Sequence, residues 1–129
     1  MTETHSSHSG RPAPTQNSFE LFAWFFMRVS GIILLFLALG HLVIMHLINN
    51  IGNIDYAFVV ERWKTPFWRS YDGLMLFLAL LHGVNGLRTI LDDWLRPGMW
   101  RVFGMSLLYV TFLIFLILGF TVLLTFQPQ

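Results

Sequence analysis

One line of chemically capable residues runs through the segment HGVNGLRTILDDW, residues 82–94. If this segment is helical, a turn of 100° per residue places Gly86 about 40° from His82 around the helix axis. Thr89 and Asp93 each return to within about 20° of His82. The line therefore carries an imidazole, a position without a side chain, a hydroxyl and a carboxylate along one face.

The imidazole of His82 lies about ten residues from Asp92, roughly 15 Å inside an apolar segment. An ionisable group at such a depth needs a partner, because its burial is otherwise costly. A neutral imidazole can form a hydrogen bond to a neighbouring helix, or it can bind a metal ion. Gly86 would leave room beside it for a flat macrocycle, although Gly83 and Gly86 would also permit close contact between helices. Arg88 and Asp92 point away from this line.

The composition is that of a membrane protein. Hydrophobic residues make up 55% of the 129 residues, and charged residues only 12%. Residues 29–48 and 102–129 contain no charged side chain, and residues 73–91 contain only Arg88. About 20 apolar residues cross a hydrocarbon core of roughly 30 Å, and these runs lack the polar face of a helix on a soluble core. We expect an all-α integral membrane protein with three transmembrane helices.

The polar segments between these runs predict the layout. Residues 1–18 are expected to form a disordered cytoplasmic tail, and residues 19–129 a three-helix transmembrane domain. Pro66 suits the first turn of the second helix, and the RPG at residues 96–98 is a turn signal before the third. The first loop could hold a short interfacial helix. The positive-inside rule places the N-terminus in the cytoplasm, since five arginines lie on its side (Arg11, Arg28, Arg88, Arg96 and Arg101) and three basic residues on the other (Arg62, Lys64 and Arg69).

The first predicted helix carries histidines of its own. Ser30 and His41 are eleven residues apart and share a face. His41 could bind a metal or form a structural hydrogen bond, whereas His46 is rotated by about 140° and lies near the outer interface, where it can meet water or headgroups. The depths of His41 and His82 differ by about 10 Å. If both bind haem, we expect each to have its own haem, with the opposite ligand supplied by another subunit.

The net charge of +1 does not indicate a nucleic acid or another acidic partner, and the chain contains no cysteine. It therefore cannot ligate an iron–sulfur cluster through thiolates. Any redox chemistry must come from histidine, from a bound organic cofactor or from another chain.

Two motifs together resemble a known family. The order Arg–x–Ser–Gly at residues 28–31, followed by His–Gly–x–x–Gly and an Asp–aromatic pair in residues 82–94, is similar to the D-type hydrophobic membrane anchor subunit of bacterial succinate dehydrogenase, respiratory complex II. This resemblance implies a helical bundle formed with a C-type cytochrome b anchor subunit. It also implies an iron–sulfur subunit and a flavoprotein subunit, which oxidises succinate, on the cytoplasmic face of the cell (inner) membrane.

The resemblance implies roles for individual residues. His82 would be an axial ligand of a b-type haem between the two anchor subunits, and Arg28 would lie near the haem propionates. His41 would ligate a second haem in relatives that have two. Ser30 and Gly86 belong to the same candidate cofactor-binding set.

Asp93 and Trp94 would lie beside the quinone pocket, and the quinone would be menaquinone or ubiquinone. Many relatives have tyrosine where this chain has Trp94. An indole N–H can donate a hydrogen bond but cannot accept one, so this departure bears on the direct quinone contact.

The implied function is electron transfer from the iron–sulfur subunit to quinone, with succinate oxidation on other subunits, as part of the respiratory chain and the tricarboxylic acid cycle. A fumarate reductase anchor, which serves the reverse reaction, is an alternative. A non-redox structural or transporter subunit is another, in which His82, Asn85 and Arg88 merely bond neighbouring helices.

Overall fold

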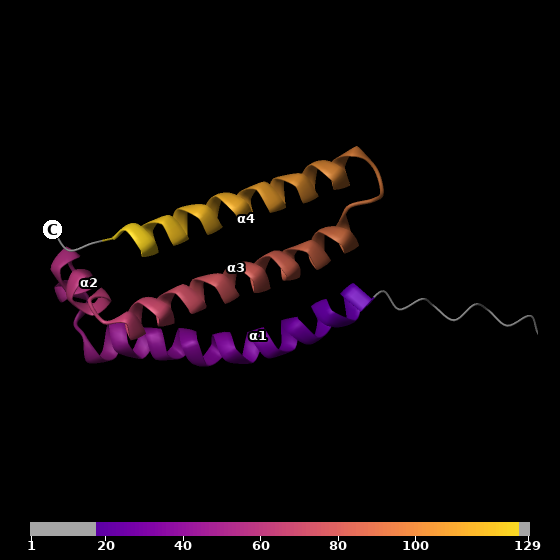
Figure 1. Ribbon diagram of the computed structural model, residues 1–129. Coiled ribbons are helices and arrows are strands. Elements are labelled where there is room, and N and C mark those ends of the chain that lie inside the picture. Colours follow the sequence, from indigo (N-terminus) through magenta and orange to yellow (C-terminus); the bar gives the residue numbers. More distant parts are fainter. Residues whose placement is uncertain (1–17, 127–129) are drawn as a thin grey trace, which may run out of the picture.

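The computed structural model describes residues 18–126 of the chain, and the elements in this part are helical (Figure 1). In chain order they are α1 (Ser18–Leu42), a π-helical continuation η1 (Val43–Ile48), a 3₁₀ turn η2 (Ile51–Asn53), α2 (Tyr56–Trp63), α3 (Pro66–Trp94) and α4 (Met99–Thr125). The polar tail predicted for residues 1–18 lies outside the described residues, except for Ser18, which begins α1.

Three helical segments are long and apolar enough to cross a membrane. They are Ser18–Ile48 with 31 residues, Pro66–Trp94 with 29 and Met99–Thr125 with 27. At 1.5 Å per residue each is longer than the roughly 30 Å of a hydrocarbon core. The predicted all-α fold with three transmembrane helices is confirmed.

The helix boundaries follow from local chemistry. Pro66 occupies the first turn of α3, where its missing N–H removes no hydrogen bond, and Thr65 before it is extended. Gly98, in the predicted RPG turn, has a φ of 149°, which L side chains rarely adopt, and α4 begins directly after it. Asp55 caps α2 by accepting a 2.8 Å hydrogen bond from the backbone N–H of Phe58. The short helix predicted for the first loop is therefore present as α2.

The middle helix of the bundle is α3, which packs against α1 on one side and α4 on the other (Figure 1). The α1–α3 and α3–α4 connections lie at opposite ends of the bundle, and α2 lies at the end where the first of them is found. There Phe126, just after α4, packs its ring 5.1 Å from that of Trp63 and 5.4 Å from that of Tyr56. Helix α2 therefore packs against α3 and, through Tyr56 and Trp63, against Phe126 just after α4.

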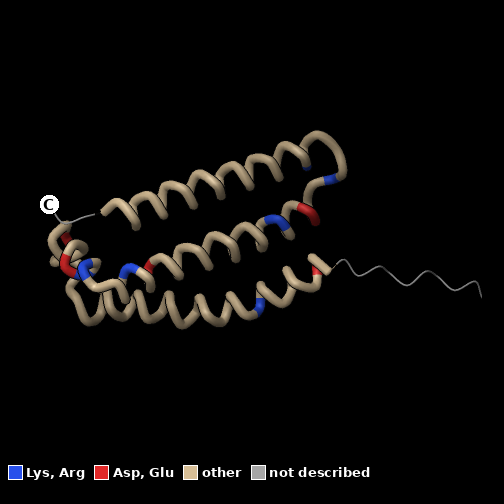
Figure 2. Tube along the Cα trace, viewed as in Figure 1, with Lys and Arg blue, Asp and Glu red and all other residues tan. Residues whose placement is uncertain are grey.

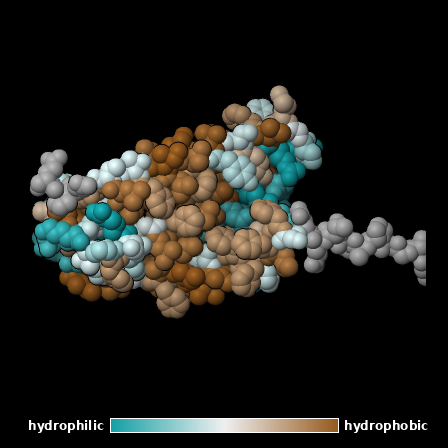
Figure 3. Space-filling view, viewed as in Figure 1, coloured by the Kyte–Doolittle hydropathy of each residue, from teal (hydrophilic) through white to brown (hydrophobic). Residues whose placement is uncertain are grey.

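Charged and apolar side chains are segregated along the bundle axis. The charged residues lie toward the two ends (Figure 2), and one face of the molecule shows a hydrophobic band between hydrophilic ends (Figure 3). Within residues 18–126 the buried hydrophobic residues are only Ala23, Leu108 and Leu123, whereas most large apolar side chains are exposed. In a bilayer this outer apolar surface faces lipid or other helices, and the polar contacts between helices become the structural feature that distinguishes one packing from another.

Candidate functional site

The imidazole of His82 contacts α1 at the middle of the bundle. Its Nδ1 lies 2.9 Å from the Oγ of Ser30. Ser30 has only 1% of its surface exposed, the lowest value among the buried residues. Its hydroxyl also lies 2.6 Å from the backbone oxygen of Phe26, one turn earlier in α1. The residue that begins the polar line of α3 is thus held by a buried hydroxyl of the neighbouring helix.

Gly31 lies against the same imidazole. A Cβ atom added at Gly31 would be 3.3 Å from the Cε1 of His82, which is tighter than most real contacts. The two consecutive residues of the Arg–x–Ser–Gly motif therefore serve one histidine, since Ser30 bonds its ring and Gly31 makes space for that ring. This contact gives a physical reason for the pairing of the two motifs.

Gly86 allows close helix contact. The Cε of Met27 lies 3.3 Å from where a Cβ at Gly86 would be, so the end of a flexible thioether side chain covers the position. The space predicted beside His82 is in this chain taken by Met27. Methionine adapts its shape readily, and a bound group would need only to displace its terminal methyl.

At its other end, at Thr89 and Asp93, the polar line no longer makes hydrogen bonds to α1. The Thr89 hydroxyl bonds the backbone oxygen of Asn85 at 3.0 Å, within its own helix. Asp93 and Trp94 are exposed, Trp94 to 83%. Neither side chain forms a hydrogen bond or an ion pair with residues 18–126. The line therefore runs from a histidine between helices to a carboxylate, and both this carboxylate and the neighbouring indole of Trp94 are exposed to contact with other molecules.

A groove between α1 and α3 lies beside this line. Its volume is about 650 Å³. It is lined by Glu20, Ala23, Trp24, Met27, Arg28, Asn85, Gly86, Arg88, Thr89 and Ile90. The guanidinium of Arg28 lies 4.1 Å from the centre of the Trp24 ring and pairs with no carboxylate in the described part of the chain. A cation held only by an aromatic face remains available to an anionic group in the groove.

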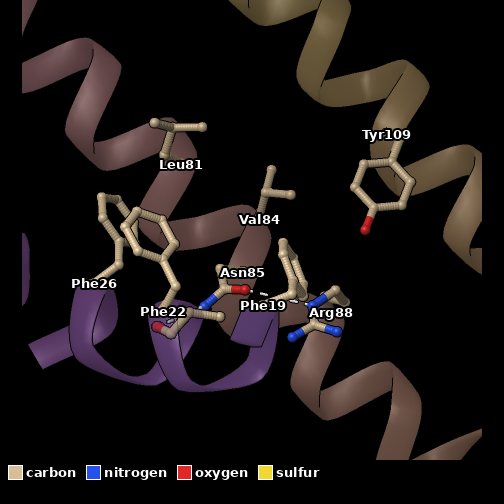
Figure 4. Close-up of a pocket in the computed structure, with 9 residues that line it drawn as sticks. Phe19, Phe22, Phe26, Leu81, Val84, Asn85, Arg88 and Tyr109 are labelled. Atoms are coloured by element: carbon tan, nitrogen blue, oxygen red, sulfur yellow. Dashed lines mark hydrogen bonds between the residues drawn. The ribbon is translucent and has the colours of Figure 1, made fainter. Parts of the chain in front are cut away.

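A second pocket, of about 220 Å³, shares Ala23, Asn85 and Arg88 with the groove and extends toward Tyr109 of α4 (Figure 4). Its remaining lining is apolar and comes from Phe19, Phe22, Phe26, Leu81 and Val84. The Asn85 amide bridges the helices by donating a 3.4 Å hydrogen bond to the backbone oxygen of Ala23, and its oxygen accepts one of 3.4 Å from Arg88. Asn85 and Arg88 therefore stabilise helix contacts.

The charged residues near this end tie the three long helices together. Arg88 donates two 3.2 Å hydrogen bonds to the carboxylate of Glu20 on α1. Asp92 accepts a hydrogen bond from Arg101 on α4 and lies 3.7 Å from Arg88. Arg88 therefore bonds α1, the helix that His82 also contacts, whereas Asp92 bonds α4.

A second polar cluster, the Asp72 cluster, comprises His41, Arg62, Trp63 and Asp72. The carboxylate of Asp72 accepts hydrogen bonds from the guanidinium of Arg62 at 3.0 and 3.4 Å and from the indole N–H of Trp63 at 2.8 Å. The Nδ1 of His41 lies 3.5 Å from the same carboxylate. Elements α1, α2 and α3 therefore meet at one acid. His46 is exposed and its side chain makes no such contact within residues 18–126.

The two intramembrane histidines lie at different levels. Ser30 and His41 both contact α3, as their shared face predicts, and the eleven residues between them correspond to about 16 Å along α1. Because His82 lies level with Ser30, the two imidazoles within this chain are too far apart to bind one iron atom. This geometry agrees with the expectation that each histidine would need its own haem.

Sequence reasoning missed Asp72 as a partner of His41. The uncharged run was counted from Gly73, so the acid one residue earlier, within the second predicted helix, was given no role. The sequence did contain a sign of this acid's role. A cation, Arg62, and an N–H donor, Trp63, come about ten residues before the acid Asp72, which lies in the first turns of the next helix. Gly31 was quoted only as part of a motif, and its contact with His82 became visible only in three dimensions.

These features define the class: a small multi-pass membrane subunit with an imidazole held between two of its spans. Residues 6–121 match the family described as succinate dehydrogenase/fumarate reductase transmembrane subunit. The chain belongs to this family.

Two curated relatives are named succinate dehydrogenase hydrophobic membrane anchor subunit. The protein from Archaeoglobus fulgidus is 33% identical over 74 residues, which cover 57% of this chain and 62% of the relative. The protein from Thermoplasma acidophilum is 28% identical over 69 residues, which cover 54% of this chain and 56% of the relative. The chain thus matches somewhat more than half the length of each.

The Asp72 cluster predicts a stability effect. Asp72→Asn removes the charge opposite Arg62, whose side chain is only 6% exposed, and should lower the free energy of unfolding by about 2 kcal/mol, because a buried cation then lacks its partner. The matched control Glu61→Gln breaks an exposed pair with Lys64 and should cost less than about 1 kcal/mol. Unfolding of the purified protein in detergent micelles measures both. Equal effects of the two substitutions would contradict this role of Asp72.

Proposed function

We propose that this chain is the membrane-anchor subunit of a succinate:quinone oxidoreductase and that His82 supplies one axial ligand of a b-type haem. The second ligand comes from a partner anchor subunit of the cytochrome b type. The observation that carries the proposal is the imidazole of His82, fixed at Nδ1 by Ser30 and given space by Gly31, in a chain of this family. The other ring nitrogen forms no hydrogen bond within residues 18–126 and is left for a metal.

Two features near His82 and Ser30 support the proposal of a haem. Arg28 offers an unpaired guanidinium in the groove beside α3, which suits a propionate carboxylate. Gly86 has no side chain to fill the groove, and only the flexible end of Met27, from α1, covers this position. When bound, the haem supplies a site that is reversibly reduced by one electron. The chain's own part would be to hold the imidazole of His82 and to place the cation of Arg28 beside a propionate.

Quinone would bind near the end of the polar line, with menaquinone and ubiquinone both compatible with the residues present. Reduction of a quinone takes up two electrons and two protons. Asp93 is an exposed carboxylate that could pass a proton from water, and the Trp94 N–H is an exposed donor that could bond a quinone carbonyl. Because both side chains are free of contacts within this chain, the remaining walls of the pocket would come from the partner anchor and the iron–sulfur subunit.

Electrons would reach this site from the iron–sulfur subunit, which receives them from a flavoprotein subunit that oxidises succinate. The anchor in a fumarate reductase would use the same residues in the opposite direction, and the family description includes both enzymes. The flavin and quinone potentials decide the direction. A non-redox subunit is the contrasting function, in which the contact between Ser30 and His82 would be purely structural.

The haem proposal predicts that His82→Ala removes a b-type haem band. The reduced-minus-oxidised difference spectrum of the purified complex measures it. The matched control is His46→Ala, which removes an exposed imidazole from the same chain and should leave the band intact. A band of normal intensity in His82→Ala would refute the ligand assignment, and wild-type protein without haem or a flavoprotein partner would support the non-redox alternative.

The number of haems is a separate question. We propose one haem, because the imidazole of His41 lies 3.5 Å from the carboxylate of Asp72, which already accepts hydrogen bonds from Arg62 and Trp63, whereas the imidazole of His82 is oriented by a hydrogen bond to Ser30. Pyridine haemochrome quantification should give one haem per flavin, and His41→Ala should not change it. Two haems per flavin, with one lost in His41→Ala, would instead establish the outer haem site.

The membrane is proposed to be the bacterial cell (inner) membrane, with the start of α1 on the cytoplasmic side. Because the chain contains no cysteine, single cysteines can report its orientation. Thr65→Cys should react with a membrane-impermeant maleimide in intact cells, whereas Met99→Cys should react only after permeabilisation. Both residues are exposed, and labelling is read on this chain after the subunits are separated. The reverse pattern would invert the orientation.

A further inference from the structure

The hydrogen bonds of Ser30 determine which nitrogen of His82 carries the proton. The Ser30 hydroxyl has one hydrogen and lies 2.6 Å from the backbone oxygen of Phe26. A carbonyl oxygen can only accept, so an oxygen–oxygen distance this short requires the hydroxyl hydrogen between the two atoms. The same Oγ must then act as acceptor toward the Nδ1 of His82, 2.9 Å away.

The neutral imidazole of His82 therefore carries its proton on Nδ1, and the lone pair lies on Nε2. The bond between Ser30 and Phe26 is of the i to i−4 type common for serine in helices. It orients the Ser30 oxygen, which is 1% exposed and has no room to turn toward solvent. One backbone carbonyl of α1 thus fixes, through one hydroxyl, the tautomer of a side chain on α3.

We propose that Ser30 is a positioning residue for the haem ligand: by accepting a hydrogen bond from the Nδ1–H of His82 it would present Nε2 to the iron and make the imidazole a stronger electron donor. This inference rests on the proposed function. A hydrogen bond from the distal N–H of a ligating histidine fixes its orientation and raises its basicity. A more basic axial ligand stabilises the oxidised iron, and such second-shell hydrogen bonding is one of the ways a protein adjusts a haem potential.

The test is a redox titration of the purified complex, with the haem midpoint potential as the readout. Ser30→Ala removes the acceptor and should shift the haem midpoint potential to a more positive value. Ser30→Thr keeps the hydroxyl and should restore the wild-type potential. Ser106→Ala is the matched control, because Ser106 is exposed on α4 and its side chain forms no hydrogen bond within residues 18–126; it should not change the potential.

The possible outcomes separate this inference from the haem proposal. A positive shift in Ser30→Ala alone, or loss of haem in Ser30→Ala with retention in Ser30→Thr, supports the role of the hydroxyl. An unchanged potential in Ser30→Ala, or loss of haem in both variants, overturns it, since the position would then matter only for packing. If His82→Ala retains the haem, the ligand assignment itself fails, irrespective of the result at Ser30.

Discussion

The contact between Ser30 and His82 sets the arrangement of this bundle. It joins two of the apolar segments that are long enough to cross a membrane, α1 and α3, where water cannot replace a lost partner. Because lipid tails are as apolar as leucine side chains, hydrophobicity alone does not choose which helix faces which. A buried hydroxyl opposite an imidazole, with Gly31 leaving room for the ring, defines which faces of α1 and α3 meet at this level. The groove beside Arg28 follows from that register.

The polar contacts divide into three levels along the axis, each with a different consequence. Glu20, Arg88, Asp92 and Arg101 tie the long helices together near the start of α1. The Asp72 cluster holds α2 and the other end of α1 against α3. In the first group the charged side chains pair with one another, and in the second the carboxylate of Asp72 is bonded by Arg62 and Trp63. His82, between these two groups, bonds Ser30 through Nδ1, and its other ring nitrogen forms no hydrogen bond within residues 18–126. The proposed haem ligation is placed at that nitrogen.

Part of the site was predictable and part was not. The face shared by Ser30 and His41 followed from helix periodicity, and both residues do contact α3. Periodicity also gave the line from His82 to Asp93, yet it did not show that the line leaves the helix contact before Asp93. The partner of each histidine lies 52 or 31 residues away in the chain. Such pairings depend on the relative height and rotation of two helices, which no local pattern encodes.

The sequence by itself determined the class of this protein: three runs with at most one charged side chain, each long enough to span a bilayer, turns at Pro66 and Gly98, and two motifs that resemble those of its family. These properties are local, because hydrophobicity, span length and turn chemistry depend on neighbouring residues. Only the tertiary structure decided that Ser30 bonds His82 and that Met27 covers Gly86. It also decided that Arg62 and Trp63 bond the carboxylate of Asp72 and that His41 lies beside it. Those contacts arise when helices pack, since a side chain's partner is then set by the register between helices.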